Sequence, residues 1–170
     1  MNAEVDKIKN SSKVKTIRIV RKNPESGEYS TLAAALSGTD STYEIHIFEG
    51  IYEEYHVNLP RGITIIGYGN VIIQGHLPKE ESVTHSVNWS TLECANGAIL
   101  RNLTITARNL RYPIHADGSR GNALWDMRDC KFIHYGNKEI YDYHLEAGDG
   151  THTGVVSGCS AFGQGCHGGD

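Results

Sequence analysis

Apolar and polar residues alternate with a period of two over much of the chain, which predicts β-strands. From Tyr43 onward, Tyr43, Ile45 and Ile47 fall on one face of an extended segment, and Glu44 and His46 fall on the other. Similar runs predict further strands at Thr16–Val20, Ile63–Ile66, Val71–Ile73, Ile99–Ile105, Asp129–Ile133 and Val155–Phe162. Because Gly, Asn and Asp separate these runs, we expect an all-β protein.

One segment has helical spacing instead. Tyr29, Leu32 and Leu36 recur three to four residues apart, with Ser30 in the place of an N-cap and Gly38 in the place of a stop. The pattern predicts one short amphipathic helix from Tyr29 to Leu36, and no second helix is expected.

An internal repeat gives the strongest sign of organisation. In three segments a turn-forming residue precedes an apolar, a polar and another apolar residue: Arg101–Ile105, Arg128–Phe132 and Ser157–Ala161. The aligned apolar residues Leu103, Cys130 and Cys159 follow one another at nearly equal steps along the chain. Arg61–Ile65 fits the same template after a longer step, if Leu77–Trp89 forms an extra loop.

Nearly equal steps of this kind are typical of a solenoid, in which each coil pairs with the coils above and below it. We therefore predict a parallel β-solenoid with Leu103, Cys130 and Cys159 stacked inward, and the predicted helix is in the right place to cap its N-terminal end. A β-sandwich, whose strands also recur at short intervals, is the alternative. Residues 1–15 are expected to form a flexible arm, and residues 16–170 one domain.

Composition narrows the function classes. The 170 residues include 19 Gly but only 4 Pro, which suits a turn-rich β protein and excludes collagen-like or Pro-rich chains. The net charge of −4 offers no basic excess for general nucleic-acid binding. No apolar run reaches membrane-spanning length and Met1–Lys15 is charged throughout, so neither membrane insertion nor a signal peptide is expected. The four cysteines are too widely spaced for a disulfide scaffold.

Residues 29–75 resemble a known family. Tyr29–Leu36, Ile45–Glu54 and Leu59–Gly69 are similar to the opening of a right-handed parallel β-helix of the pectin-lyase-like superfamily, and to pectin methylesterases in particular, although Glu49 stands where those proteins have Pro. The catalytic Gln and Gln-Asp pair of that family do not occur in the corresponding segments, Arg111–Asp117 and Phe132–Glu139. The resemblance therefore implies a shared scaffold and not esterase activity.

Parallel β-helices without these catalytic residues are common in the tail spikes, tail fibres and neck appendages of bacteriophages, and this chain resembles them. The resemblance implies a virion structural protein that acts in host attachment and is made in the host cytoplasm. It also implies that the protein forms a homotrimer and contacts other virion proteins. The sequence also fits the N-terminal fragment of a longer solenoid. A carbohydrate-active esterase, lyase or hydrolase is the alternative.

Two segments at equivalent places in successive repeats are predicted to lie on the same side of the solenoid and to bind a host-surface polysaccharide. In Tyr141–Glu146 an acid, a base and aromatic rings alternate, and at His115 and Asp117 a base lies beside a carboxylate. The alternatives are a solvated outer face of one coil for Tyr141–Glu146 and hydrogen bonding across a turn for His115 and Asp117. The predicted ligand-binding residues are Arg111, Tyr112, His115, Asp117, Asp142, His144 and Glu146.

No cofactor and no metal site are expected. Cys159, Cys166 and His167 are possible ligands, but no zinc-binding spacing occurs.

Overall fold

The computed structural model describes residues 14–77, 90–93, 98–110, 112–115, 125–135, 154–157 and 160–163. This part of the chain is rich in strands, has almost no helix and contains parallel sheets, so the all-β prediction is confirmed.

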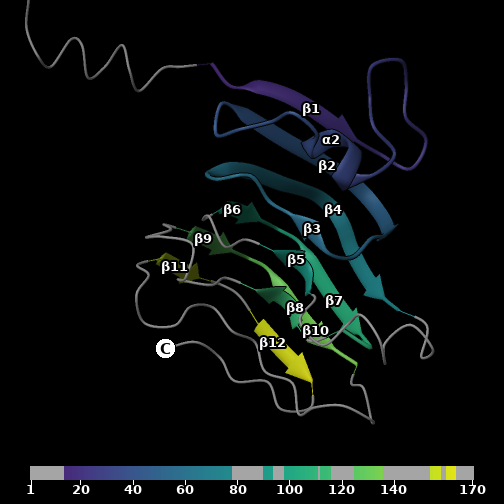
Figure 1. Cartoon of the computed structure of the whole chain (residues 1–170), viewed down its shortest axis with the longest axis vertical. Helices are drawn as coiled ribbons and strands as arrows, with labels where there is room; N and C mark the ends of the chain where they lie inside the picture. Colours follow the sequence, from purple (N-terminus) through teal and green to yellow (C-terminus); the bar gives the residue numbers. More distant parts are fainter. Residues whose placement is uncertain are drawn as a thin grey trace, which may run out of the picture.

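A large sheet and a small one contain the strands. The large sheet consists of β1 (Thr16–Val20), β2 (Tyr43–Glu53), β4 (Ile63–His76), β6 (Ala98–Arg101), β7 (Thr104–Arg108), β9 (Trp125–Arg128), β10 (Lys131–His134), β11 (Gly154–Ser157) and β12 (Ser160–Gly163). The small sheet consists of β3 (Val57–Asn58), β5 (Ser90–Glu93) and β8 (Tyr112–His115). Every pairing between these strands is parallel. Figure 1 shows β1, β2 and β4 one below another in the upper part of the view, with β6, β9 and β11 following at the left and β7, β10 and β12 toward the lower right.

The long strand β4 organises the large sheet. It pairs with β2 along most of its length, its first part pairs with β6 and its second part with β7. Beyond that point the sheet continues as two rows, β6–β9–β11 and β7–β10–β12. Asn102 and Asp129, at φ angles of 52° and 55°, lie where β6 passes to β7 and β9 to β10. The left-handed conformation that Asn and Asp tolerate thus ends the predicted Ile99–Ile105 strand and divides it in two.

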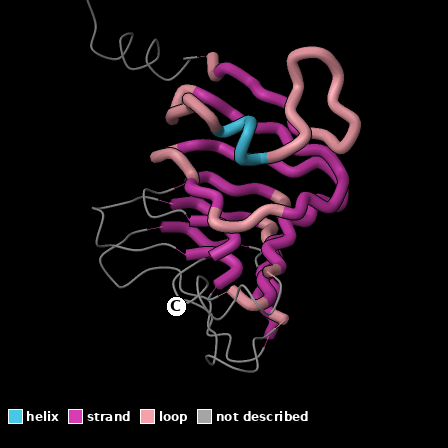
Figure 2. The backbone as a smooth tube through the Cα atoms, turned by 45° about the vertical axis from the view of Figure 1, so that its right-hand side comes forward, coloured by secondary structure: helices cyan, strands magenta, loops and turns pink. Residues whose placement is uncertain are grey.

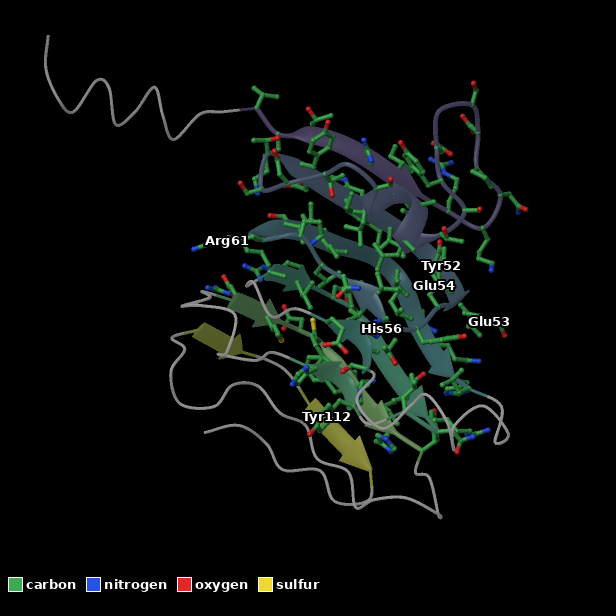
Figure 3. All side chains as sticks on the ribbon, in the orientation of Figure 1. Tyr52, Glu53, Glu54, His56, Arg61 and Tyr112 are labelled. Carbon is green, nitrogen blue, oxygen red and sulfur yellow. The ribbon has the colours of Figure 1, made fainter. Side chains whose placement is uncertain are left out.

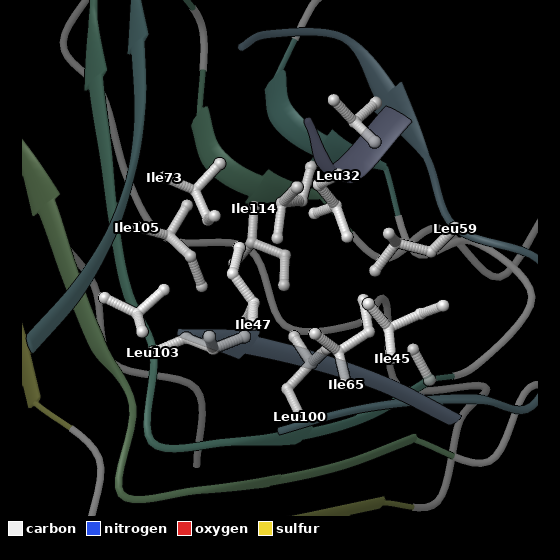
Figure 4. Packing of buried hydrophobic residues seen from close by; sticks show 14 of the residues in the cluster. Leu32, Ile45, Ile47, Leu59, Ile65, Ile73, Leu100, Leu103, Ile105 and Ile114 are labelled. Atoms are coloured by element: carbon white, nitrogen blue, oxygen red, sulfur yellow. The ribbon is translucent and has the colours of Figure 1, made fainter. Parts of the chain in front are cut away.

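The core is built from columns of equivalent residues on neighbouring strands. One column contains Ile45, Ile65, Leu100 and Met127, and Figure 4 shows the first three side by side. A second contains Tyr52, Ile73, Ile105 and Phe132. All of these side chains are buried. Burying each one contributes roughly 1.5–3 kcal/mol, so the inward face of the large sheet supplies much of the stability.

The predicted inward stack holds where the structure describes it. Leu103 and Cys130 are each 2% exposed, and their neighbours Thr104 and Lys131 pair in register. Lys131 in turn pairs with Ser160, while Cys159 lies outside the described residues.

The prediction that Arg61–Ile65 is equivalent to Arg101–Ile105, which matches Ile63 with Leu103, is wrong. Ile63 pairs with Ala98, and Ile72, further along the same strand, pairs with Thr104. Val71 therefore takes the place matched to Leu103. The left-handed turn at Gly69, with φ 75°, bends one long strand here, so both halves of β4 take part in the repeat.

The helix is shorter than predicted. α2 spans Leu32–Leu36, and its N-cap is Thr31, not Ser30, because the Thr31 side chain accepts a hydrogen bond from the Ala34 N–H. Glu54, directly after β2, accepts hydrogen bonds from the N–H groups of Leu32 at 2.6 Å and Ala33 at 2.8 Å. These bonds fasten α2, the short helix in Figure 2, to the strands on which its apolar face packs. Glu54 belongs to the segment that resembles the esterases, and its role here is structural.

The two faces of β1 differ from those of the other strands. Ile17 points outward and is 55% exposed, whereas Arg18 points toward α2 and donates hydrogen bonds to the carbonyls of Ala35 and Ser37. The Arg18 guanidinium also lies 4.7 Å from the centre of the Tyr43 ring. The inward position that apolar residues hold on β2 and β4 is therefore occupied on β1 by a charged group that fixes the helix.

Candidate functional site

Two of the seven predicted ligand-binding residues lie in the described part of the chain. Tyr112 and His115 are on β8, where Tyr112 is 2% exposed and His115 is partly exposed. The other five lie outside the described residues: Arg111, Asp117, Asp142, His144 and Glu146. The predicted stacking of the two segments on one side of the molecule therefore stays a prediction.

His115 belongs to a group of titratable side chains on the small sheet, which we call the Glu93 cluster (Glu93, His115, His56 and Tyr112). Glu93 on β5 and His115 on β8 are partners in register, and Glu93 Oε2 lies 2.9 Å from His115 Nδ1. His56, just before β3, has its Nδ1 3.9 Å from Glu93 Oε1. In Figure 3 His56 lies near the middle of the molecule and Tyr112 below it, both in the region of the small sheet.

Local backbone geometry positions both histidines. The parallel register between β5 and β8 places Glu93 and His115 on the same side of the sheet, because partners in a register share a face. His56 adopts φ 54°, and its N–H donates to the Ser90 carbonyl at 2.8 Å. This hydrogen bond ties the turn before β3 to the strand that carries Glu93.

The Glu93 carboxylate is buried and ionised. Its side chain is 9% exposed. Burial by itself raises the pKa of this carboxyl, but hydrogen bonds from His115 and from the Ser90 N–H, at 3.0 Å, together outweigh burial and lower the pKa below its ordinary value. Glu93 therefore carries a negative charge at neutral pH and acts only as an acceptor.

An ionised partner fixes the tautomer of His115. Because the carboxylate only accepts, Nδ1 of His115 is the protonated nitrogen, and in the neutral ring Nε2 then holds the lone pair. The Tyr112 ring stacks on the imidazole, with centroids 5.3 Å apart and planes 14° from parallel. A carboxylate and an aromatic ring thus hold His115 in one orientation. This arrangement suits a hydrogen-bond acceptor for a ligand hydroxyl, or a general base.

Sequence reasoning found His115 but not its partner. It paired His115 with Asp117, two residues away, whereas the described carboxylate partner is Glu93, 22 residues earlier. Neither Glu93 nor His56 was among the predicted residues. The small sheet pairs residues at separations that differ from the steps of the repeat, so the repeat carried no signal for this contact.

A second polar group lies on the outer face of the large sheet. Glu44 Oε1 accepts from His46 Nε2 at 2.6 Å, and Tyr68 Oη lies 3.2 Å from His46 Nδ1. Phe48 stacks on Tyr68 with centroids 5.1 Å apart, and Arg21 lies over the Phe48 ring. These groups contact one another on the outer face, where Phe48 and Tyr68 are 36% and 40% exposed.

Neither family models nor curated protein sequences match this chain. In the described part of the chain, no three His, Cys, Asp or Glu side chains are placed to hold a metal ion, and the possible ligands Cys159, Cys166 and His167 lie outside that part. Cys130 is a buried thiol whose Sγ donates to the Arg128 carbonyl at 3.4 Å. Within the same residues, no helix has the length and apolar character that crossing a membrane requires.

Proposed function

We propose that the chain is a right-handed parallel β-helix of the pectin-lyase-like superfamily, with α2 capping its N-terminal end. The parallel pairing of Thr104 on β7, Lys131 on β10 and Ser160 on β12, at nearly equal steps along the chain, supports this fold, since a solenoid brings equivalent residues together in this way. Connections between parallel strands of one sheet are right-handed in almost all known proteins, which supports the handedness.

On this fold we propose a bacteriophage virion structural protein that recognises a host-surface polysaccharide during attachment. The Glu93 cluster carries the proposal of glycan recognition. It places a buried carboxylate, two histidines and an aromatic ring together, and such groups recognise hydroxyl-rich ligands by hydrogen bonding. The virion setting rests on the resemblance to pectin-lyase-like β-helices that lack the catalytic Gln and Gln-Asp pair, which are similar to phage appendage proteins.

Binding to polysaccharide tests the recognition. The purified chain is applied to an array of bacterial capsular and lipopolysaccharide O-antigen preparations, beside the variants His115→Ala and Glu53→Gln. Wild type and Glu53→Gln, which alters an exposed residue away from the cluster, are expected to bind one polysaccharide class equally well. His115→Ala is expected to lose that binding. Equal binding by a folded His115→Ala variant would exclude the cluster as the site.

The virion setting and the trimer need separate measurements. Antibodies against the chain are expected to label the tail or neck of phage particles in electron micrographs. Sedimentation velocity is expected to give three times the 18.7 kDa mass of one chain. Absence of label from intact particles would contradict the virion proposal, and a monomer would contradict the trimer.

A carbohydrate-active enzyme is the second candidate, and the orientation of His115 by Glu93 is the observation that favours it. An imidazole held by a carboxylate is a common general base in hydrolytic and lyase reactions. Release of reducing sugar from the bound polysaccharide tests this candidate. Release of sugar by wild type would establish catalysis. Loss of that release in Glu93→Gln would place the catalytic residues in the Glu93 cluster, and loss in the double variant Asp142→Ala/His144→Ala would place them on the Tyr141–Glu146 segment. Binding without release supports an appendage that only attaches.

A further inference from the structure

We infer that a cavity at the bend of the large sheet binds one neutral sugar ring. Three successive turns line it, and each contributes a polar residue at an equivalent position: Asn70, Asn102 and Asp129. The cavity has a volume of about 240 Å³. Pockets for drug-sized ligands measure roughly 300–1,000 Å³, so this space suits a ligand smaller than those. The inference shares the ligand class of the proposed function but concerns a different place in the fold.

The turns are equivalent because the strands after them are in register. Ile72, Thr104 and Lys131 pair across β4, β7 and β10, and each lies two residues after one of the three polar residues. Neighbouring parallel strands lie about 4.8 Å apart. The polar side chains therefore follow one another along the bend at a spacing comparable to that of hydroxyl groups on opposite sides of a sugar ring.

Hydrogen bonds from the Asn102 side chain to the backbone of the preceding turn hold the cavity in shape. The Asn102 side-chain amide donates to the carbonyls of Gly67 at 3.0 Å and Gly69 at 3.3 Å. A side chain at position 67 would collide with the Asn102 carbonyl, so glycine is required there. The Nδ2 group of Asn102 is thereby committed to the preceding turn, and Oδ1 remains as an acceptor. Ligand binding would need little rearrangement of this wall.

The polar groups at the rim are available to a ligand. The Asp129 carboxylate and the Lys131 ammonium are exposed; no hydrogen bond or ion pair joins either side chain to another described residue, and Asp129 interacts electrostatically with Arg128. Below them Leu103 and Cys130 form a buried, apolar floor. Hydrogen-bonding groups around a small apolar surface match a sugar ring, which has hydroxyls at its edge and C–H groups on its faces.

Charge distinguishes a sugar from an ion. One carboxylate and one ammonium line the same small cavity, so a phosphate would face Asp129 and a divalent cation would face Lys131. Calcium also prefers six to eight oxygen ligands, commonly from several carboxylates, and the cavity offers a single one. A neutral ligand with both donors and acceptors satisfies both charged groups without leaving either unpaired.

Titration of the ¹⁵N-labelled chain by NMR tests the inference. The probes are glucose, galactose, mannose, N-acetylglucosamine and N-acetylgalactosamine, with inorganic phosphate and calcium chloride as charged comparisons. At least one neutral sugar is expected to shift the amide signals of Asn102, Leu103, Cys130 and Lys131. Phosphate and calcium are expected to leave these signals in place. Stronger shifts with either ion, or no shift with any sugar up to its solubility limit, would overturn the inference.

Matched variants locate the binding. Asp129→Asn removes the charge but keeps a residue that tolerates φ 55°, so the turn is preserved. It is expected to weaken sugar binding about tenfold or more, the loss typical of one hydrogen bond to a charged group. Glu53→Gln removes one charge elsewhere and is expected to bind like wild type. Unchanged binding by Asp129→Asn would refute the site.

The same spectra separate this inference from the proposed function. Sugar-dependent shifts confined to Glu93 and His115 would leave the proposed function standing and exclude the cavity. Shifts confined to the cavity, together with loss of polysaccharide binding in Asp129→Asn but not in His115→Ala, would support the cavity and exclude the Glu93 cluster as the binding site.

Discussion

Replacing Glu93 with alanine tests whether a buried carboxylate holds the small sheet together. The substitution removes the acceptor of two hydrogen bonds, from His115 Nδ1 at 2.9 Å and from the Ser90 N–H at 3.0 Å. A buried donor left unsatisfied costs about 1–3 kcal/mol, and the lost charge-assisted bond to a partly exposed histidine adds about 1 kcal/mol. We expect Glu93→Ala to lower the free energy of unfolding by about 2–4 kcal/mol.

Glu93→Gln separates the charge from the shape. The amide oxygen still accepts from the Ser90 N–H, and His115 can change its tautomer to accept from the amide nitrogen. We expect this variant to lose about 1–2 kcal/mol, roughly half the effect of alanine. Urea unfolding followed by tryptophan fluorescence and circular dichroism gives both values. A loss below about 0.5 kcal/mol for Glu93→Ala, the range of ordinary surface substitutions, would refute the reasoning.

The same carboxyl predicts a pH dependence. Hydrogen bonding holds the folded-state pKa of Glu93 below its ordinary value of 4.5, in spite of burial, so the unfolded chain binds this proton more readily. The resulting stabilisation is complete above pH 4.5 and disappears as the pH falls through the folded-state pKa. The difference in stability between wild type and Glu93→Gln is therefore expected to shrink over this acidic window. A difference that stays constant as the pH falls would contradict it.

Three further substitutions test other parts of the fold by the same unfolding measurement. Glu54→Ala removes the acceptor of two helix N–H groups and is expected to lower the free energy of unfolding by about 1.5–3 kcal/mol. Glu53→Ala, at an exposed neighbour, is expected to lower it by less than about 0.5 kcal/mol, and equal effects of the two variants would contradict the capping role of Glu54. Gly75→Ala brings a Cβ into collision with Thr91 Oγ1 and is expected to cost about 1–3 kcal/mol, so wild-type stability would show that the sheets are not in close contact here. Burial lowers the pKa of His134 and outweighs the opposite effect of its backbone hydrogen bond, so the unfolded chain binds this proton more readily. Wild type is therefore expected to lose stability as the pH falls below 6.5, and His134→Gln to lose less. Parallel plots of unfolding free energy against pH for the two proteins would contradict this.

The strands of the large sheet could be predicted because their pattern is local. In β2 the alternation places Ile45 and Ile47 at 0% exposure and leaves Phe48 outside. The inward pairing of Leu103 with Cys130 also followed from sequence, since the same residue pattern recurs at a regular step. In the first case the information lies within a few residues of the predicted position, and in the second it lies in the repetition of a short pattern along the chain.

The candidate site could not be predicted in the same way. Glu93 and His115 meet because β5 and β8 are neighbours in a sheet whose spacing differs from the main repeat, and nothing in the residues near Glu93 indicates that its carboxylate is buried. The bend at Asn102 was predicted only in part: Asn102 is the turn-forming residue of the repeat template, but the predicted strand Ile99–Ile105 runs through it. An Asn within a run of alternating apolar and polar residues does not by itself indicate that the strand is interrupted. The left-handed conformation of Asn102 depends on the preceding turn, where its side chain donates to the Gly67 carbonyl.

The all-parallel pairing of the strands has a consequence for how fast the chain acquires its structure. Among the described strands none folds back on its neighbour in the sequence through a hairpin, and apart from the isolated bridge between Val20 and Tyr29, even the nearest strand partners, such as Glu44 and Thr64, are separated by a long stretch of chain. Each pairing must therefore close a long loop before any ladder hydrogen bond forms, and this entropic cost comes before the gain. Chains dominated by such distant contacts fold in milliseconds to seconds rather than microseconds. Until Tyr29 pairs with Val20, the edge of β1 that faces away from β2 can pair with the strands of other chains, so refolding yield is expected to fall as protein concentration rises.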